Sequence, residues 1–406
     1  MDMMRITGGR VLLPEGEQTT DVLLADGRIA AIGNDAASGD AASGDARGWD
    51  AQGGAARGSR TFDARGLLVL PGIVDIHGDA FERQLQPRPG VDFPPDLALA
   101  DTEAQLLSNG ITTAFHGITL SWEPGLRSPD AWRALVGALR ARPWTCDMRV
   151  HLRWEAYNLD ALELALADIA AGHVHLVAFN DHTPSILKKI ADPVAGAKYS
   201  DRAGMKLEAF RDLAERIGAR VDAVPAARAR IAEAARRAGT PLASHDDATI
   251  AERTAFRELG ARICEFPIAE AVGEAARAAG DWVVMGSPNV VRGGSHIGWA
   301  SAARLVEAGI CNVLSSDYYY PAMLRAALIL AGRGVLDLAQ AWALVSTNPA
   351  RATGLSDRGM ISPGMRADLL VVDANIPQVV ATIAGGRVAF LTQPGAQRLG
   401  ADLMPA

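Results

Sequence analysis

The sequence predicts an α/β fold, in which a (β/α)8 TIM-like barrel fills the middle of the chain and a small β-sandwich domain is built from both chain ends. Two observations predict it. In the middle of the chain, short apolar runs alternate with amphipathic runs of helical spacing, and strand-like runs with turn residues flank that part on both sides. We expect the barrel at residues 67–355 and the small domain at 1–66 and 356–406.

The two ends of the chain have the pattern of short strands joined by turns. We expect strands within residues 6–32, where Asp26-Gly27 is typical of a two-residue hairpin turn. Residues 34–60 are Ala, Ser, Gly and Asp repeats that offer little to bury, so we expect a flexible loop there. The runs 364–373 and 379–390 again predict strands, which we expect to join the N-terminal strands in one small domain.

The central part carries eight apolar runs that each predict a strand, and eight is the number that a closed parallel barrel needs. These runs are 68–76, 112–117, 147–154, 175–180, 241–245, 261–266, 282–285 and 312–316. Runs rich in Ala, Leu and Arg with helical spacing lie between them, at 130–142, 207–215, 223–238 and 268–279. Because helix follows strand nearly throughout, a barrel is favoured over a doubly wound sheet.

The composition excludes several classes of protein. No apolar run approaches the roughly 18 residues of a membrane span, and three cysteines cannot form a disulfide framework. The first ten residues lack the basic-then-apolar layout of a secretory signal, so we expect a cytoplasmic protein. A net charge of −7 argues against a general nucleic-acid binder. Tryptophans and apolar surface on the predicted barrel helices make a homodimer plausible.

Polar side chains gather where the predicted barrel strands end, which is the end that carries the active site in such barrels. Residues i and i+2 of a strand point the same way, so His77 and Asp79 can converge on one cation. The remaining strand ends supply His116, Glu155, Asp181, His182, His245, Asp246, Asp247, Glu265 and Asp317. The sequence therefore predicts a site that is rich in imidazole and carboxylate groups.

Imidazole and carboxylate ligands with few sulfurs suit a divalent metal ion, Zn²⁺ in the first place and Mn²⁺ as the alternative. We expect one or two ions, held by His77, Asp79, Glu155, His182, His245 and Asp317. We expect Asp246, His116 and Glu265 to support these ligands. The alternatives are packing inside the barrel for His116 and an ion pair with an arginine for Glu265. Such a site lowers the pKa of bound water and suits hydrolysis.

Ordered motifs along the whole chain resemble the amidohydrolase superfamily. They are LPGIVDIH at 70–77, SD at 316–317, NPAR at 348–351 and PGMRADL at 363–369. Within that superfamily the chain is similar to the α-D-ribose 1-methylphosphonate 5-triphosphate diphosphatases of the carbon-phosphorus lyase pathway. The motifs that carry this narrower resemblance are HGD at 77–79, ER at 82–83, PRPG at 87–90, DHTP at 181–184, ASHDDAT at 243–249, PNVVRGGSH at 288–296 and SSDY at 315–318.

The resemblance implies a metal-dependent hydrolase that removes diphosphate from a ribosyl 5-triphosphate and leaves the 5-phosphate. It also implies that Asp317 accepts the proton of the attacking water. A triphosphate needs cationic and backbone donors around it. The groups expected to bind this phosphorylated sugar are Arg88, Asp181, Lys198, Arg292 and His296.

The chain departs from the pattern of those diphosphatases at Gly78, Ala80, Gln84 and Trp299, all near the predicted pocket. These departures leave an alternative open, namely a hydrolase that cleaves a C–N bond of an acidic or phosphorylated substrate, as a deacetylase or a cyclic amidase does. A non-enzymatic alternative is a metal-containing barrel that binds a phosphorylated ligand. Release of diphosphate would distinguish the diphosphatase from both alternatives.

Overall fold

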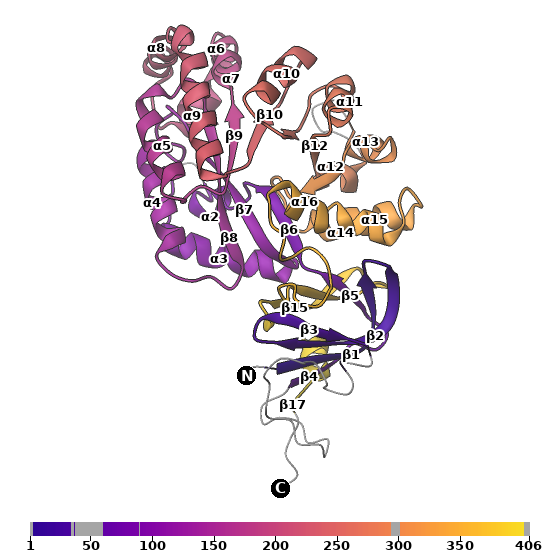
Figure 1. Ribbon diagram of the computed structural model, residues 1–406. Helices are drawn as coiled ribbons and strands as arrows, with labels where there is room; N and C mark the ends of the chain where they lie inside the picture. The colour runs from indigo at the N-terminus through magenta and orange to yellow at the C-terminus, as the bar shows by residue number, and fades with distance from the viewer. Residues whose placement is uncertain (1–2, 34–35, 37–59, 89, 294–300, 402–406) are drawn as a thin grey trace.

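The chain folds into a parallel β/α barrel and a mixed β-sheet, which Figure 1 shows one above the other, with both chain ends at the sheet. This computed structural model describes residues 3–33, 36, 60–88, 90–293 and 301–401. Most of the predicted loop at 34–60 lies outside those residues, and so do His296 and Trp299.

The barrel consists of eight parallel strands whose order in space follows their order in the chain. They are β6 (Ile73–Gly78), β7 (Ile111–Leu120), β8 (Asp147–Glu155), β9 (Leu176–Asn180), β10 (Leu242–His245), β11 (Ile263–Glu265), β12 (Trp282–Gly286) and β13 (Val313–Ser315). The ends of β6 and β13 meet in a parallel bridge between Gly78 and Asp317, where the Asp317 amide donates to the His77 carbonyl at 2.9 Å. The predicted barrel is therefore confirmed, and it is nearly closed.

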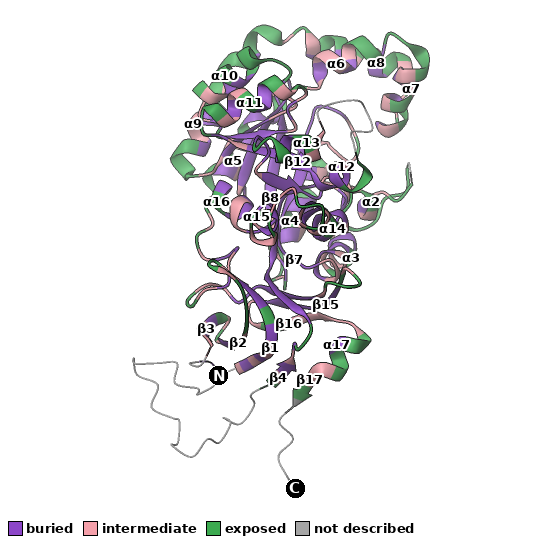
Figure 2. Cartoon of the chain, turned by 90° about the vertical axis from the view of Figure 1, so that its right-hand side faces the viewer, coloured by how far each residue is buried: buried purple, intermediate pink, exposed green. Residues whose placement is uncertain are grey.

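Helices cover the outside of the barrel, and Figure 2 shows their exposed green faces around the buried strands. They are α2 (Glu82–Leu85), α3 (Pro95–Ser108), α4 (Pro129–Arg140), α5 (Leu162–Ala170), α6 (Thr183–Lys189), α7 (Pro193–Arg202), α8 (Leu207–Gly218), α9 (Val224–Ala238), α10 (Ile250–Glu258), α11 (Glu270–Ala278), α12 (Ser287–Arg292), α13 (Ala302–Glu307), α14 (Ala322–Gly332), α15 (Leu338–Ala343) and α16 (Thr347–Ala352). Local signals fix several starts: Ser128 caps α4, and Thr249 forms a capping box with Glu252 at α10.

The mixed sheet contains nine strands drawn from both ends of the chain, as the sequence predicts. They are β1 (Met3–Leu13), β2 (Gly16–Ala25), β3 (Arg28–Ile32), β4 (Arg60–Asp63), β5 (Leu68–Pro71), β14 (Leu369–Asp373), β15 (Gln378–Ala384), β16 (Arg387–Leu391) and β17 (Leu399–Ala401), with α17 (Gln393–Arg398) before the last. The predicted hairpin turn joins β2 to β3, and Asp26 and Gly27 both have positive φ, at 50° and 78°.

The predicted first barrel strand, 68–76, is wrong as a single element. The structure divides it into β5, which pairs with β1 and β14 in the mixed sheet, and β6, which opens the barrel. Gly72 lies between them, where a Cβ atom would come within 2.3 Å of Thr112 Oγ1. An unbroken apolar run hides this change of sheet, since both strands are buried. The expected domain boundaries stay a prediction, and β5 lies beyond the expected end of the first segment.

Side chains bridge the mixed sheet and the barrel at the end opposite to the expected site. Trp342 Nε1 donates to the Pro71 carbonyl at 3.0 Å, and Thr382 Oγ1 donates to the Leu107 carbonyl at 2.7 Å. Leu370 packs on Gly110, where a Cβ atom would come within 1.9 Å of its Cδ2. Each fully buried aliphatic side chain at such a junction stabilises the fold by about 1.5–3 kcal/mol. The two parts are therefore packed against each other.

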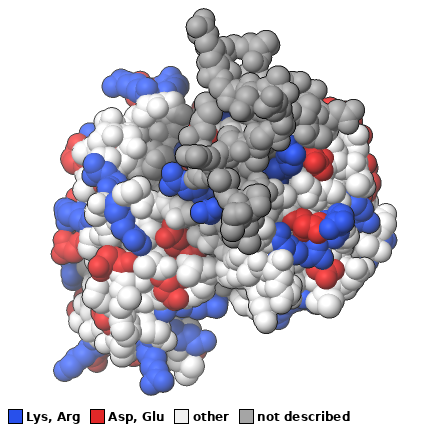
Figure 3. All heavy atoms as spheres, turned by 90° about the horizontal axis from the view of Figure 1, so that it is seen from below, with Lys and Arg blue, Asp and Glu red and all other residues white. Residues whose placement is uncertain are grey.

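Within the described ranges, no helix is both long enough and apolar enough to cross a membrane. Figure 3 views the molecule from the mixed-sheet end, and acidic and basic side chains are interspersed on the described part of that face.

Candidate active site

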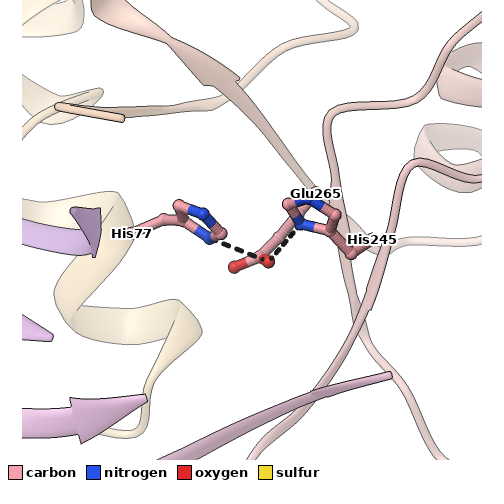
Figure 4. Close-up of side chains that lie close together, drawn as sticks. All are labelled: His77, His245 and Glu265. Atoms are coloured by element: carbon pink, nitrogen blue, oxygen red, sulfur yellow. Dashed lines mark hydrogen bonds and ion pairs between the residues drawn. The ribbon is translucent and has the colours of Figure 1, made fainter. Parts of the chain in front are cut away.

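The strand ends of the barrel bring imidazoles and carboxylates together in a buried cluster. His77 is the last residue but one of β6, His245 ends β10 and Glu265 ends β11, and Figure 4 shows the carboxylate between the two rings. Glu265 Oε2 lies 3.0 Å from His77 Nδ1 and 3.3 Å from His245 Nδ1. The two rings are stacked, with their centroids 5.1 Å apart. One carboxylate oxygen thus orients two histidines.

Both of these histidines are neutral in the protein. Burial lowers the pKa of His77 to about 3, and burial together with the Arg153 charge lowers the pKa of His245 well below its usual value. A neutral imidazole carries one N–H and one lone pair. With Nδ1–H of each ring donating to Glu265, the lone pair of each ring lies on Nε2. A carboxylate that fixes the tautomer of a histidine in this way is typical of metal sites.

A second cluster lies on the other side of the His245 ring. His182 Nε2 is 3.8 Å from Asp246 Oδ2, and His245 Nε2 is 3.6 Å from Asp246 Oδ1. Glu155 accepts hydrogen bonds from the His182 ring and from its amide. Although burial opposes it, the Glu155 carboxylate raises the pKa of His182 to about 9. His245 therefore belongs to two groups of potential ligands, one with His77 and Glu265 and one with His182 and Asp246.

The closing edge of the barrel carries two further carboxylates. The Asp79 amide donates to the Asp317 carbonyl at 3.0 Å, so both residues sit where β6 and β13 meet. Burial and the nearby Asp79 charge raise the pKa of Asp317 to about 7. Below them Asp75 accepts hydrogen bonds from the amide and the hydroxyl of Ser316, at 3.0 and 2.6 Å. Asp75 therefore fixes the backbone that presents Asp317.

Backbone strain is concentrated at the same end of the barrel. Four described non-glycine residues have positive φ, and three of them lie one or two residues after barrel strands: Asp246 at 59°, Phe266 at 53° and Asp317 at 55°. The left-handed region is unfavourable for a residue with a Cβ atom, particularly for the bulky Phe266. Strained residues persist where the surrounding structure holds them, and they cluster at functional sites. The conformation turns two of the site carboxylates relative to their strands.

Buried polar atoms without a partner show that the cluster suits a cation. His151 lies on β8, and its Nδ1 donates to the Ile76 carbonyl at 3.1 Å, so its lone pair is on Nε2. That Nε2 atom faces Glu265 Oε1 at 3.8 Å, and both atoms are buried without a hydrogen bond. Two facing acceptors are unfavourable unless a cation or a proton lies near them. Neutral imidazoles and carboxylates are also the donor set of a divalent metal site.

Three further residues that the sequence places at strand ends, namely His116, Asp181 and Asp247, differ in what surrounds them. Burial lowers the pKa of His116 to about 4, and its Nε2 is buried without a partner while its ring contacts Phe81. Asp181 forms an ion pair of 2.6 Å with Arg228. Asp247 lies buried behind the site, bonded to Ser244 and, at 3.4 Å, to Arg253. These three residues lie around the cluster and not in it.

The structure does not bring the expected anion-binding residues to the cluster in one group. Arg88 and Lys198 are exposed, on the loop after α2 and on α7. Arg292 is exposed at the end of α12, and its Nη1 lies 3.4 Å from the Tyr318 hydroxyl, one residue after Asp317. His296 lies outside the described residues. Their roles stay predictions.

The sequence reasoning missed Arg153, which lies at the centre of the site. It projects from β8 between His151 and Glu155, two residues from each, and it is 6% exposed. Its Nη2 lies 3.0 Å from His245 Nε2, and its Nη1 lies 3.5 Å from Asp79 Oδ2. The alternation of a strand, which places residues i and i+2 on one face, was a sufficient signal.

The chain is similar in sequence to known proteins. Residues 98–390 match a family described as the amidohydrolase family. The chain is 34% identical over 321 residues to the α-D-ribose 1-methylphosphonate 5-triphosphate diphosphatase of Escherichia coli strain K12, covering 76% of this chain and 84% of that protein. A shorter match, 29% identical over 119 residues, is to an allantoinase of Bacillus licheniformis and covers 29% of this chain and 21% of that protein.

Solved structures share the fold at low sequence identity. A β-aspartyl dipeptidase of Fervidobacterium islandicum AW-1 superposes with a TM-score of 0.62 at 16% identity, over 96% of each chain. A 5-methylcytosine deaminase of Klebsiella pneumoniae superposes with a TM-score of 0.59 at 18% identity, over 96% of this chain and 98% of that one. These likenesses concern the barrel and the mixed sheet alone.

Proposed function

This chain belongs to the amidohydrolase family, and from that premise we propose that it is a metal-dependent diphosphatase. The proposed reaction takes α-D-ribose 1-methylphosphonate 5-triphosphate and water to the 5-phosphate and diphosphate. The observation that carries the proposal is the 34% identity to a diphosphatase over 84% of that protein, in a chain whose strand ends gather imidazoles and carboxylates.

The residues that would hold a divalent ion are those whose lone pairs converge on the site. They are His77 and His245, with Asp79, His182, Glu155 and Asp317 as the expected further ligands, while Glu265 orients the two rings. When bound, the ion would supply an acidified water and neutralise phosphate charge. Zinc is the first choice for such a donor set and manganese the second.

Asp317 is proposed to take the proton from the attacking water and to pass it to the departing diphosphate. Its place supports this role, because the bridge to β6 holds its backbone beside His77 and Asp79. A carboxylate positioned in this way contributes about a hundred- to ten-thousand-fold to a rate. The role requires Asp317 to be ionised before the water attacks.

Anionic oxygens of the substrate would meet donors on the loops around the barrel mouth. Arg292 supports this proposal through its contact with the Tyr318 hydroxyl at 3.4 Å, since Tyr318 is the residue after Asp317. Arg88, Lys198 and His296 complete the proposed phosphate contacts, and Arg228 holds Asp181 at the rim. Guanidinium groups bind phosphate through paired hydrogen bonds, which fits the two arginines to this task.

The departures from the diphosphatase pattern differ in how far they are expected to change the substrate. At Gly78 a Cβ atom would come within 2.7 Å of Asp75 Oδ2 and 2.8 Å of Ser316 Oγ, so close packing demands glycine here. Ala80 is buried, and Gln84 is partly buried with a buried Oε1 atom that has no partner. We therefore propose that the substrate is still a sugar triphosphate. Of these three positions, Gln84 is the one that we expect to alter substrate specificity.

The test is release of diphosphate from the 1-methylphosphonate 5-triphosphate by protein of known metal content. We expect release from zinc-loaded protein, none after chelation, and recovery when zinc is restored. Asp317→Asn is expected to abolish release, whereas Asp373→Asn, at the end of β14 in the mixed sheet, is the matched control and should behave like wild type. Metal-loaded wild-type protein that releases no diphosphate would contradict the proposal.

The second candidate is hydrolysis of a C–N bond. It is favoured by the shorter matches to an adenine deaminase of Methylobacterium, 42% identical over 77 residues, and to the allantoinase. These matches cover 19% and 29% of this chain, far less than the diphosphatase match. Cleavage of a cyclic amide by the same metal-loaded protein, without release of diphosphate from the triphosphate, would favour this candidate.

A further inference from the structure

Arg153 reaches the centre of the site through a gap that glycine leaves open. A Cβ atom at Gly117, on the neighbouring strand β7, would come within 3.1 Å of Arg153 Cδ and 3.7 Å of His77 Nε2. The arginine stem thus passes over Gly117 and carries a permanently charged guanidinium into the barrel, where it is 6% exposed. A buried charge needs strong partners nearby.

The partners of Arg153 are two of the expected metal ligands. Its Nη2 lies 3.0 Å from His245 Nε2, its Nη1 lies 3.5 Å from Asp79 Oδ2, and its Nε is buried without a partner. A guanidinium has only donors, so His245 Nε2 must accept the hydrogen bond. The lone pair of His245 is therefore already in use, and its Nδ1–H points to Glu265.

A metal ion and Arg153 cannot share His245. A neutral imidazole has one lone pair, and both groups of potential ligands include this ring. An ion near His182 and Asp246 would bind the Nε2 atom that Arg153 now occupies. An ion between the Nδ1 atoms and Glu265 would require the proton of His245 to move to Nε2, which would then no longer accept from Arg153. Either ion breaks the same hydrogen bond.

We propose that Arg153 is a positioning residue that competes with the metal ion: it holds His245 and Asp79 in place as a resident cation and is displaced from His245 when a divalent ion binds. The inference rests on the proposed function in one respect, namely that the site takes a divalent ion. The opposite view makes Arg153 a purely structural counter-charge. If Arg153 competes with the ion, its removal tightens zinc binding; if it is purely structural, its removal leaves zinc binding unchanged or weakens it.

The experiment measures the zinc affinity of metal-free protein by competition with a chromophoric chelator. Arg153→Gln is expected to bind zinc roughly ten- to a hundred-fold more tightly than wild type, the ratio that corresponds to one hydrogen bond to a charged group. Arg149→Gln is the matched control, because Arg149 lies on the same strand but pairs with Asp147 at 2.9 Å outside the site. The control should bind zinc like wild type.

A second variant keeps the test valid where Arg153→Gln does not fold. Arg153→Lys retains the charge but lacks the forked donors, and its zinc affinity should lie between those of wild type and Arg153→Gln. Variants at Arg153 that bind zinc as weakly as wild type, or more weakly, would overturn the inference and leave the proposed function standing. Wild-type protein that binds no zinc would instead contradict the proposed function.

Discussion

Two buried arginines, one at each end of the barrel, have the same exposure and opposite surroundings. Arg358 and Arg153 are each 6% exposed. At the end that meets the mixed sheet, Arg358 donates to Thr113 Oγ1 at 2.8 Å, to Asp147 Oδ2 at 2.6 Å and to Asp357 Oδ1 at 2.8 Å. At the other end Arg153 has one contact at 3.0 Å, one at 3.5 Å and a nitrogen without a partner.

The difference shows that stabilising interactions and reactive groups lie at opposite ends of this barrel. Satisfied buried charges hold the sheet to the barrel, where nothing has to change during function. Unsatisfied buried groups gather at the strand ends, together with three of the four described positive φ values of non-glycine residues. Buried polar groups are nearly always paired in proteins, so a concentration of exceptions points to a place that binds something.

The largest expected effect comes from a substitution that abolishes activity but leaves the fold intact. Asp317→Asn is expected to lower turnover about a thousand-fold, because the proposed proton acceptor is lost. Metal content should fall far less than turnover, because the other expected ligands remain. The melting temperature should change little, since the amide keeps the shape and the backbone bridge to β6 is unaffected. Turnover assays and elemental analysis of the same preparation check this. Turnover close to wild type would remove Asp317 from the mechanism.

The converse substitution lowers the stability of the fold but leaves the activity of the folded protein unchanged. Arg358→Ala is expected to destabilise the protein by about 3 kcal/mol, because it leaves buried acceptors, among them Asp147, without their partner. The turnover of the folded fraction should stay near that of wild type. Thermal unfolding and assays below the transition measure the two effects. Arg153→Gln, with fewer contacts to lose, should destabilise less, and an equal loss would undo the contrast between the two ends.

Glu265 tests whether orientation of the histidines matters for the metal. Glu265→Gln keeps the size of the side chain but removes the carboxylate that accepts from His77 and His245. Zinc affinity is expected to fall about ten- to a hundred-fold, as it does when a group that orients a metal-binding histidine is lost. Chelator competition measures it. Glu270→Gln, on the outer helix α11, is the control, since Glu270 pairs with Arg304 on the surface.

The smallest expected effect concerns pH and the pair of Glu155 and His182 in metal-free protein. Glu155 raises the pKa of His182 from 6.5 to about 9, so the stabilisation is complete below pH 6.5 and is lost as the pH rises through 9. The pKa of Glu155 is lowered below 4.5, because His182 outweighs burial, and its contribution is lost on acidification. Melting temperatures should therefore decline from pH 6.5 to 9 in wild type, and less steeply in His182→Gln. Parallel declines would contradict this.

Much of the fold follows from local patterns in the sequence. The eight apolar runs mark the eight barrel strands because parallel strands covered on both faces are buried throughout, as in β7. Asp26-Gly27 marks its hairpin because the turn needs two positive φ values. The division of 68–76 at Gly72 could not be predicted, since the apolar pattern is the same in both sheets and the steric demand comes from the distant Thr112.

Part of the candidate site could also be predicted from local patterns in the sequence. His77, His245 and Glu265 lie at the ends of three strands, and the structure places both rings within hydrogen-bonding distance of Glu265. Arg153 escaped notice because an arginine is usually exposed, and burial inside a barrel depends on the room that Gly117 leaves. The contacts of Asp75 with Ser316 join residues 241 positions apart, which no local pattern encodes. The roles of all these residues remain predictions.

The position of β5 has a consequence for how the chain folds during synthesis. One residue separates β5 from β6, and β5 pairs with β14 (Leu369–Asp373), which is synthesised long after it. Until then one edge of β5 has no neighbour, and an open apolar edge invites association with other chains. Pairing between strands that are so far apart in the sequence is also slow. We therefore expect the nascent barrel to depend on chaperones until the C-terminal strands arrive.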